Sequence, residues 1–250
     1  MILERAFDLL QAFGPDRRVM TLSELARAVD LPTSTVHRLA RKLVALGALE
    51  RHGNDYRIGL AVGTLASMTP ASAWCDQAMP YLAELQGRTR QTVHMAVLRG
   101  GEVVYLEKLR AHGTPATPTV TGGRNPAHCT AVGKVLLADL PERSLAHRLQ
   151  PPLRPLTRHS YTEPGRLRAE LRRIRGSGFA VDREEAAAGL SCVAAPIRSG
   201  LGVVAAVSVA FPADTATGGH AVLRPLLEAA AGIGQAIGRD CDPEWLATDR

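Results

Sequence analysis

Cysteine is scarce in this chain of 250 residues, and long apolar runs are missing. The four cysteines, at positions 75, 129, 192 and 241, lie far apart and form no C-x-x-C pair, which argues against a zinc cluster built from thiolates. Because the N-terminus has no signal-peptide pattern, we expect reduced thiols and a cytoplasmic location. No apolar stretch approaches the roughly 18 residues that a membrane helix needs, so we expect no membrane partner.

Motifs for phosphate and metal binding are also missing. Gly133-Lys134 does not complete a phosphate-binding loop, because no glycine stands five positions before Gly133 and a valine follows the lysine. The H-E-x-x-H pattern is absent, and His147 and His220 have no partners at metal-ligand spacing. We therefore expect neither a metal nor a cofactor.

The chain does have a normal apolar content and an excess of positive charge. Hydrophobic residues make up 46% of it, which is enough for a full core, and the length allows one large domain or two ordinary ones. The formal net charge is +6 and the pI is about 9.5. This balance suits a nucleic-acid partner without requiring one.

The stretch from 21 to 58 has the pattern of two short helices, a tight turn and a hairpin. Thr21 and Glu24 form a T-x-x-E capping box, so a helix is expected to start there. Pro32 interrupts the pattern and suits the first turn of a second helix, predicted to end near residue 46. Residues 49–58 place turn-forming residues between two short segments, which predicts a two-stranded wing. Together these elements predict a winged helix-turn-helix.

The exposed side of the second predicted helix suits DNA. Hydroxyl groups and the N–H groups of a first helical turn can bind phosphates, and arginine or lysine can reach guanine edges in the major groove. A solvated face without a partner is the alternative, but five positive side chains against two negative ones between 36 and 57 favour DNA. The candidate DNA contacts are Thr33, Ser34, Thr35, His37, Arg38, Arg41 and Lys42 of the helix and Arg57 of the wing.

The rest of the chain changes from helical to mixed patterns. We expect a domain boundary at Thr69-Pro70, after a linker helix at 59–68, and a kink or a break at Pro80 within a helix over 72–87. Paired β-prone segments among helices then predict an α+β domain built on an antiparallel sheet. Strands are expected at 92–98, 102–109, 179–182, 190–197 and 203–211, helices at 2–13, 130–139, 141–149, 163–175 and 220–237, and a long surface loop at 111–128.

Three stretches carry a resemblance to a known family. They are PTSTVHRLARKLVALGALER in the predicted winged unit, PAHCTAVGKVLLADLP at 126–141, and VDREEAAAGLSCVAAPIRSGLGVVAAVSVAFP at 181–212. With them the chain resembles the isocitrate-lyase-regulator (IclR) family of bacterial transcription factors. The resemblance implies a winged helix-turn-helix DNA-binding domain with a linker helix at 1–69 and a GAF-like effector-binding domain at 70–250. It also implies a homodimer or homotetramer on palindromic double-stranded operator DNA, with a small-molecule effector that is often an organic or aromatic acid.

The resemblance further implies an effector pocket. Backbone N–H groups at the start of the helix near residue 130 would hold a carboxylate. The implied pocket residues are Ala131, Val132, Asp182, Cys192, Ser208 and Ala210. Some family members have serine where this chain has Ala210, and losing that hydroxyl favours a larger or more apolar effector than the smallest oxo acids. Taken singly, Cys192 suits a core, Ser208 a bond to the backbone and Asp182 the cap of a turn.

Three classes of function stay open at this point. The first is a ligand-responsive transcriptional regulator without enzymatic activity, which we expect. The second is an enzyme with a fused DNA-binding head that uses Cys192 or Cys129; His128 could activate Cys129, although sequence neighbours rarely face each other and no third, orienting group is evident. The third is a DNA-binding protein without a ligand. The effector, the target genes, the sign of control and the choice between dimer and tetramer are left open.

Overall fold

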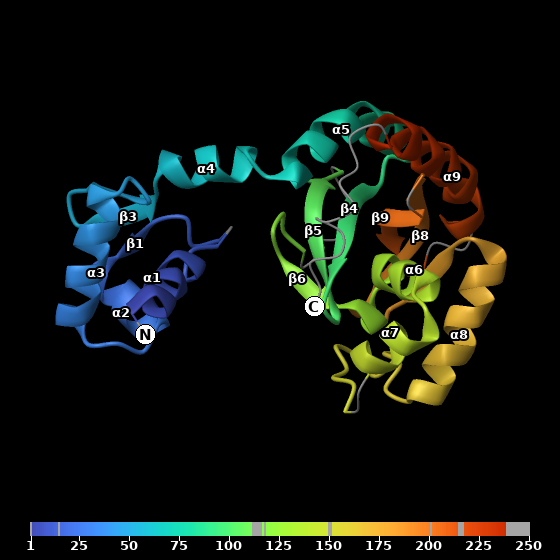
Figure 1. The fold of residues 1–250 in the computed structure, drawn as a ribbon, viewed down its shortest axis with the longest axis horizontal. Coiled ribbons are helices and arrows are strands. Elements are labelled where there is room, and N and C mark those ends of the chain that lie inside the picture. Colours follow the sequence, from blue (N-terminus) through green and yellow to red (C-terminus); the bar gives the residue numbers. More distant parts are fainter. Residues whose placement is uncertain are drawn as a thin grey trace. The chain divides into compact units, whose positions relative to one another are not determined.

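The structure is a computed structural model that describes residues 2–14, 16–111, 117, 119–149, 152–200, 202–214 and 218–238 (Figure 1). It divides into two compact units, one reaching to Ser72 and the other starting at Ala73. The division falls inside helix α5 (Pro70–Thr89), a little after the Thr69-Pro70 boundary that the sequence predicts. None of the described helices is long and apolar enough to cross a membrane.

The first unit is a winged helix-turn-helix, as predicted. It consists of α1 (Ile2–Gln11), α2 (Leu22–Ala28), α3 (Thr33–Ala45) and a three-stranded antiparallel sheet in the order β1-β3-β2, followed by α4 (Leu60–Ser67). The strands are β1 (Met20–Thr21), β2 (Leu49–His52) and β3 (Asp55–Ile58). Buried side chains from all of these elements except α4 form one core, which includes Leu9, Leu25, Val36, Leu39 and Tyr56.

The predicted capping box at the start of α2 is formed. The Glu24 N–H donates to Thr21 Oγ1 at 3.3 Å, and the Thr21 N–H donates to Glu24 Oε2 at 2.7 Å. Thr21 also belongs to β1, a short strand that the sequence analysis missed, because a two-residue strand has no periodicity of its own. Met20 pairs with Tyr56 and Thr21 with Asp55, so β1 holds the start of α2 against the wing.

The second unit is built on a six-stranded sheet with the order β6-β5-β4-β9-β8-β7, in which every neighbouring pair is antiparallel. The predicted strands are found close to their expected positions. They are β4 (Thr92–Arg99), β5 (Glu102–Leu109), β7 (Ala180–Arg183), β8 (Leu190–Ser199) and β9 (Gly202–Pro212). The segment 111–128, expected to be loop throughout, also contains strand β6 (Arg124–Pro126) and a 3-10 turn (Ala127–Cys129).

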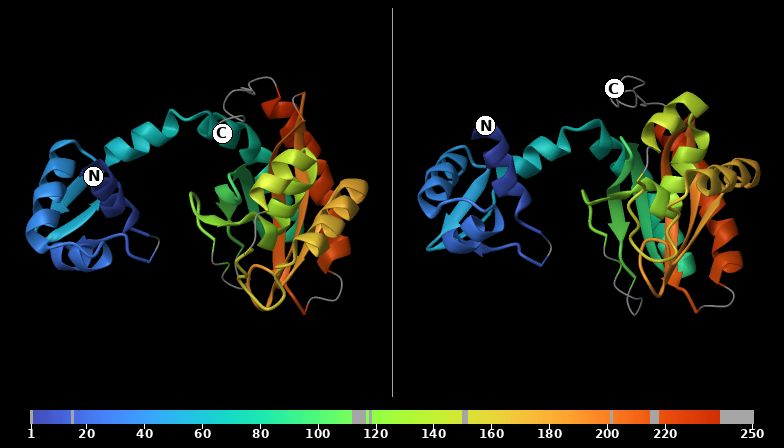
Figure 2. Two further views of the ribbon diagram at one scale, coloured as in Figure 1. Left: turned by 60° about the horizontal axis from the view of Figure 1, so that its bottom comes forward. Right: turned by 90° about the horizontal axis from the view of Figure 1, so that it is seen from below.

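Helices cover both faces of this sheet (Figure 2). One face packs against α5 and α9 (Gly218–Ile237), through side chains such as Trp74, Leu82, Val207 and Leu226. The other face packs against α6 (Ala131–Asp139), α7 (Glu142–Arg148) and α8 (Pro164–Ser177). Alternate strand residues supply the two cores, which is the period-two pattern of a sheet buried on both faces.

Helix α5 corrects one of two alternatives. Pro80 is expected to kink the helix or split it in two, and it lies within one continuous helix of 20 residues, so the helix is not split. Proline removes one backbone hydrogen bond, but Trp74, Ala78, Leu82 and Leu85 on both sides of it are buried against the sheet. The burial of that apolar face outweighs the single lost bond.

Candidate DNA-binding surface and effector cavity

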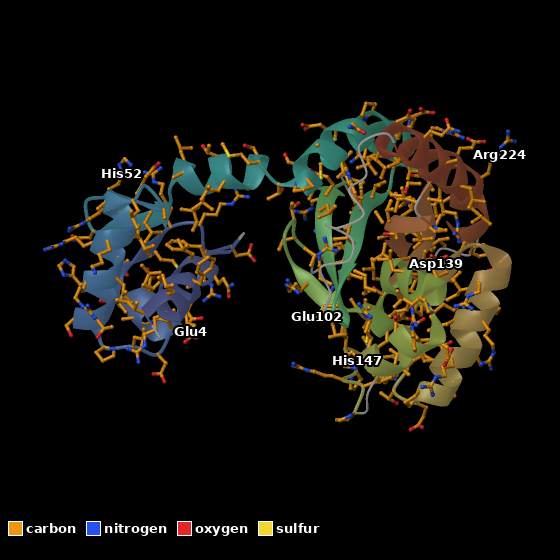
Figure 3. All side chains as sticks on the ribbon, viewed as in Figure 1. Glu4, His52, Glu102, Asp139, His147 and Arg224 are labelled. Carbon is orange, nitrogen blue, oxygen red and sulfur yellow. The ribbon has the colours of Figure 1, made fainter. Side chains whose placement is uncertain are left out.

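The predicted DNA contacts lie together on one side of α3 and on the neighbouring wing. All of them are exposed within their unit except Thr35, which is half-buried, while Val36, Leu39, Ala40 and Leu43 of the same helix are buried in the core. His52 at the end of β2, labelled in Figure 3, is exposed as well. The alternation between buried and exposed positions follows the helical period and presents a polar, basic surface to solvent.

The charged groups of this surface are free to take a partner. Among the described residues, Arg38, Arg41, Lys42 and Arg57 make no ion pair with a carboxylate. Pro32 precedes α3 and provides no side-chain cap, and the first turn contains no acid. The N–H groups of Thr33 and Ser34 and the positive end of the helix dipole are therefore available to an anion such as a DNA phosphate, whereas the Thr35 N–H donates to the Pro32 carbonyl at 2.9 Å.

One basic residue of the wing has a structural role instead. Arg51 donates from Nε to the Gly53 carbonyl at 2.7 Å, and its guanidinium lies 5.8 Å from the centre of the Tyr56 ring. Gly53 adopts a φ of +61°, which favours glycine in the hairpin turn. Arg51 thus fixes the tip of the wing and leaves Arg57 as the free wing arginine.

The predicted effector residues gather around one cavity of the second unit, between the sheet and the start of α6. Five of the six line it: Ala131, Val132, Asp182, Cys192 and Ser208. Ala210 is buried at the next paired position, opposite Cys192 and Thr92, and does not line the cavity. The open space measures about 20 Å³. That is room for one or two water molecules, so an organic acid has to displace some of the lining.

The start of α6 provides the donors at this cavity. Thr130 caps the helix, because its Oγ1 accepts the N–H of Gly133 at 3.0 Å. The N–H groups of Ala131 and Val132 belong to the first turn, where a helix has no carbonyl to offer them. Gly133 is required for packing, since a Cβ there would stand 2.1 Å from the Ala127 carbonyl oxygen. The Gly-Lys pair is therefore a packing feature of the helix start.

Sequence reasoning missed several lining residues. His94, Tyr105, Thr117, Thr119, Asn125 and Thr130 add polar side chains to the lining, and Ala186 and Leu190 add apolar ones. His94 lies directly opposite Ser208 in the β4–β9 pairing, so the alternation of the apolar strand 92–98 could have placed it on the cavity face. Its Nε2 lies 2.7 Å from Thr119 Oγ1, and burial lowers the pKa of His94 to about 3, so its imidazole is neutral.

Asp182, an acidic side chain that lines the cavity, has an unusual environment. Asp182 is almost fully buried, and burial followed by the nearby charge of Glu185 raises its pKa to about 7. Its Oδ1 accepts the N–H of Glu185 at 2.6 Å. Near neutral pH this carboxyl is a mixture of its two forms, so it can either donate to or accept from a ligand.

Behind Asp182 lies a buried ion pair. Lys134 Nζ stands 2.6 Å from Glu185 Oε1 and donates to the Val181 carbonyl at 2.7 Å, with its side chain fully buried. The sequence analysis considered Lys134 only as part of a phosphate loop. In the structure it anchors α6 to the end of β7 and neutralises Glu185.

The two candidate nucleophiles, Cys129 and Cys192, do not have the environment of reactive thiols. Burial raises the pKa of the Cys129 thiol, and the pKa of Cys192 is raised well above its usual value by burial and by Asp182. Reactive cysteines have lowered pKa values instead. His128 Nε2 and Cys129 Sγ both lie near the Arg154 carbonyl oxygen, at 3.1 and 3.7 Å. Within the described parts of the chain, no group of three or more His, Cys, Asp or Glu side chains could hold a metal ion.

Two family descriptions match the chain along most of its length. The IclR helix-turn-helix domain matches residues 2–53, and the C-terminal domain of the bacterial transcriptional regulator IclR matches residues 73–235. The transcriptional regulator KdgR of Dickeya chrysanthemi is 31% identical over 213 residues, which cover 83% of this chain and 70% of KdgR. The repressor AllR of Escherichia coli is 29% identical and covers 96% of this chain and 92% of its own length.

Solved structures agree with the fold. An IclR homologue from Microbacterium hydrocarbonoxydans in complex with 4-hydroxybenzoate is 31% identical, with a TM-score of 0.87 over 96% of this chain and all of the homologue. The IclR protein of Thermotoga maritima is 30% identical, with a TM-score of 0.77 over 94% of this chain and 98% of its own. The predicted fold class and the family resemblance are thereby confirmed. The chain belongs to the IclR family of bacterial transcriptional regulators and is a DNA-binding regulator controlled by a small-molecule effector.

Proposed function

We propose that α3 enters the major groove of an operator, with Arg38, Arg41 and Lys42 contacting bases and phosphates and Arg57 of the wing contacting the backbone. The observation that carries this proposal is the free basic face of α3 described above, next to a helix start with no acid and no cap. Thr33, Ser34 and Thr35 of the first turn supply hydroxyl groups for phosphates, and His37 adds a further donor.

The effector in this proposal is a small organic acid of the aromatic type, held at the start of α6. First-turn N–H groups of Ala131 and Val132 would bind its carboxylate. Cys192 and Leu190 would contact its apolar ring, and Asp182 and Ser208 would bond to a polar group at its other end. The homologue of known structure binds 4-hydroxybenzoate, which has this arrangement of groups.

The small size of the cavity suggests how binding is communicated. A ligand larger than the open 20 Å³ has to move lining side chains, so it binds different arrangements of the unit with different affinity. Such a difference is what an effector needs in order to shift a population of conformers. A coupling of roughly 1–3 kcal/mol to operator affinity would be typical. In this proposal the protein acts in the cytoplasm on double-stranded DNA and catalyses no reaction.

A homo-oligomer completes the proposal. None of the residues of α4 is buried, although most of them are apolar: Leu60 and Leu65 are 82% and 69% exposed, and Met68, which follows the helix, is 75% exposed. Leu3 and Phe7 of α1, in the same unit, are also largely exposed. A second copy of the chain would cover these side chains and would place two α3 helices about 34 Å apart, one turn of DNA.

The binding surface is tested with DNA selected from a random duplex library by the purified protein. Arg38→Ala should weaken binding in fluorescence anisotropy roughly tenfold or more, because one good arginine–guanine contact contributes about 1–3 kcal/mol. Asp182→Ala should leave it unchanged, and so should Arg172→Ala, which removes the same charge from an exposed position on α8. Equal affinity of the Arg38 variant and the parent would contradict the placement of the reading helix.

The effector class is tested by thermal unfolding and by operator release. 4-Hydroxybenzoate and benzoate should raise the melting temperature and change operator affinity, because they bind the folded unit. Two- and three-carbon oxo acids should do neither. Asp182→Ala should lose the response to 4-hydroxybenzoate more strongly than the response to benzoate, which lacks the hydroxyl group. A response to the short oxo acids alone would overturn the aromatic assignment while leaving the regulator assignment intact.

A further inference from the structure

The second unit has another cleft, which shares no lining residue with the effector cavity. It measures about 320 Å³ and lies between the segment that leads into α8 and the residues that follow β7. Its lining consists of Arg158, His159, Ser160, Tyr161, Thr162, Glu163, Arg166, Arg183 and Glu185. Nothing in the regulator's proposed mechanism uses these side chains.

The wall of this cleft is held in place by side-chain bonds to the backbone. Thr157 Oγ1 donates to the Glu184 carbonyl at 2.6 Å, and Ser160 Oγ donates to the Glu185 carbonyl at 2.7 Å. Ser160 Oγ also accepts the N–H groups of Leu156 and Thr157, each at 3.0 Å. These bonds attach the segment 156–160 to the residues that follow β7 and also close a turn within the segment. The cleft therefore has a defined shape.

The charge of the cleft favours an anion. Arg158, Arg166 and Arg183 are exposed, and none of them makes an ion pair with any residue that the structure describes. Two carboxylates also line the cleft, but the charge of Glu185 is balanced by Lys134 at 2.6 Å, which leaves only the exposed Glu163 against three arginines. Guanidinium groups bind phosphate and carboxylate with paired hydrogen bonds.

The buried side of the cleft needs a hydrogen-bond donor. Glu185 is only 4% exposed, and its Oε2 has no partner, whereas Oε1 accepts from Lys134. A buried carboxylate oxygen without a donor is costly, so a ligand hydroxyl at this point would be favourable. The Tyr161 ring, whose centre lies 5.1 Å from Lys134 Nζ, lines the same cleft and offers a flat surface to a small ring.

We propose that this cleft binds a small hydroxylated anion of the sugar phosphate or sugar acid class. Its anionic group is held by Arg166 and Arg183, and a hydroxyl group donates to Glu185 Oε2. Asp182 of the effector cavity accepts the N–H of Glu185 at 2.6 Å, so the two sites are neighbours along one backbone segment. The cleft would give the regulator a second metabolite input, in addition to the effector of the first cavity.

The test is isothermal titration of the full-length protein with D-glucose 6-phosphate, D-gluconate, inorganic phosphate and D-glucose. At least one of the two hydroxylated anions should bind at one site per chain, about tenfold or more tighter than phosphate, and glucose should not bind detectably. Stronger binding of glucose 6-phosphate identifies the phosphate ester as the favoured group, and stronger binding of gluconate identifies the carboxylate. No saturable binding of either, or equal binding of phosphate, would overturn the proposal.

Variants locate the site. Arg166→Gln and Arg183→Gln should each weaken binding of the preferred probe about tenfold, whereas Arg172→Gln, an exposed arginine on the same helix as Arg166, should not. Glu185→Gln should abolish the advantage of the hydroxylated anion over phosphate, with folding checked by thermal unfolding because the residue is buried. If Glu185→Gln does not fold, the variants of the exposed residues Arg166 and Arg183 still test the proposal. Equal effects of all three arginine variants would also overturn the proposal.

Discussion

At the scale of single residues, Asp182 has the environment with the clearest chemical consequence. It is buried at the effector cavity with Glu185 beside it, and both factors raise its pKa to about 7. Lys134, which lowers that pKa, is already paired with Glu185 and counteracts only part of the shift. The carboxyl can therefore hold a proton near neutral pH, which lessens its repulsion of an anionic effector.

The substitution Asp182→Asn tests this proton. The folded pKa of about 7 exceeds the reference value of 3.8, so the native state retains a proton that the unfolded chain releases between these values. The contribution of Asp182 to the stability of the parent should therefore fall as pH rises from about 4 to about 7 and then level off. Buried neutral His94 contributes in the opposite direction in both proteins, so the quantity to compare is the difference between variant and parent. Asparagine does not titrate and can keep the bond to the Glu185 N–H. The free energy of unfolding of the variant, measured in urea, should rise by up to about 4 kcal/mol relative to that of the parent between pH 4 and pH 8. A difference that does not change with pH would contradict the raised pKa.

At the scale of elements, α6 is the helix that positions the effector cavity. Its first turn lines the cavity, Thr130 caps it, and Lys134 ties it to β7. The close approach of its backbone to Ala127 requires a residue without a side chain at 133. The helix start, and with it the cavity, therefore depends on one glycine contact.

Gly133 of α6 and Gly176 of α8 provide a matched comparison of helical glycines. Gly133→Ala should lower the free energy of unfolding by about 1–3 kcal/mol or more, because its Cβ would overlap the Ala127 carbonyl. Gly176→Ala on α8 should raise it by up to about 1 kcal/mol, because nothing lies within 4 Å of its Cβ and alanine is the better helix former. Urea midpoints measure both. If both variants changed the free energy of unfolding in the same direction, the helix start would not be as tightly packed as the distances indicate.

Elements with a strong local signal could be predicted from the sequence. The capping box at Thr21 and the β-prone apolar runs at 92–98 and 203–211 depend only on nearby residues. Elements that exist through partners could not. Strand β6 has three residues and forms only because Glu102–Val104 of β5 pairs with it. The lining residues Tyr105 and Asn125 meet through the same pairing, at a sequence separation that no periodicity reveals.

At the scale of the whole molecule, the two units divide the function. The first contains the exposed basic surface of α3, and the second contains the effector cavity and the additional cleft. In the proposed homo-oligomer the first units act as a pair, since a single helix-turn-helix binds only one half-site. The exposed apolar residues of α4 matter in that proposal because they would form the contact between the two copies.

The substitution Leu65→Glu tests this pairing. Leu65 is 69% exposed on α4, so a carboxylate at 65 would be buried without a partner in the proposed dimer contact. The variant should sediment as a smaller species in analytical ultracentrifugation and bind a palindromic duplex at least about tenfold more weakly, because it loses the gain from two linked half-sites. Ala66→Glu adds the same charge at an exposed position about 100° around α4 from Leu65 and should change neither result. If Leu65→Glu kept the parent's size and affinity, the copies of the chain would have to associate through another surface.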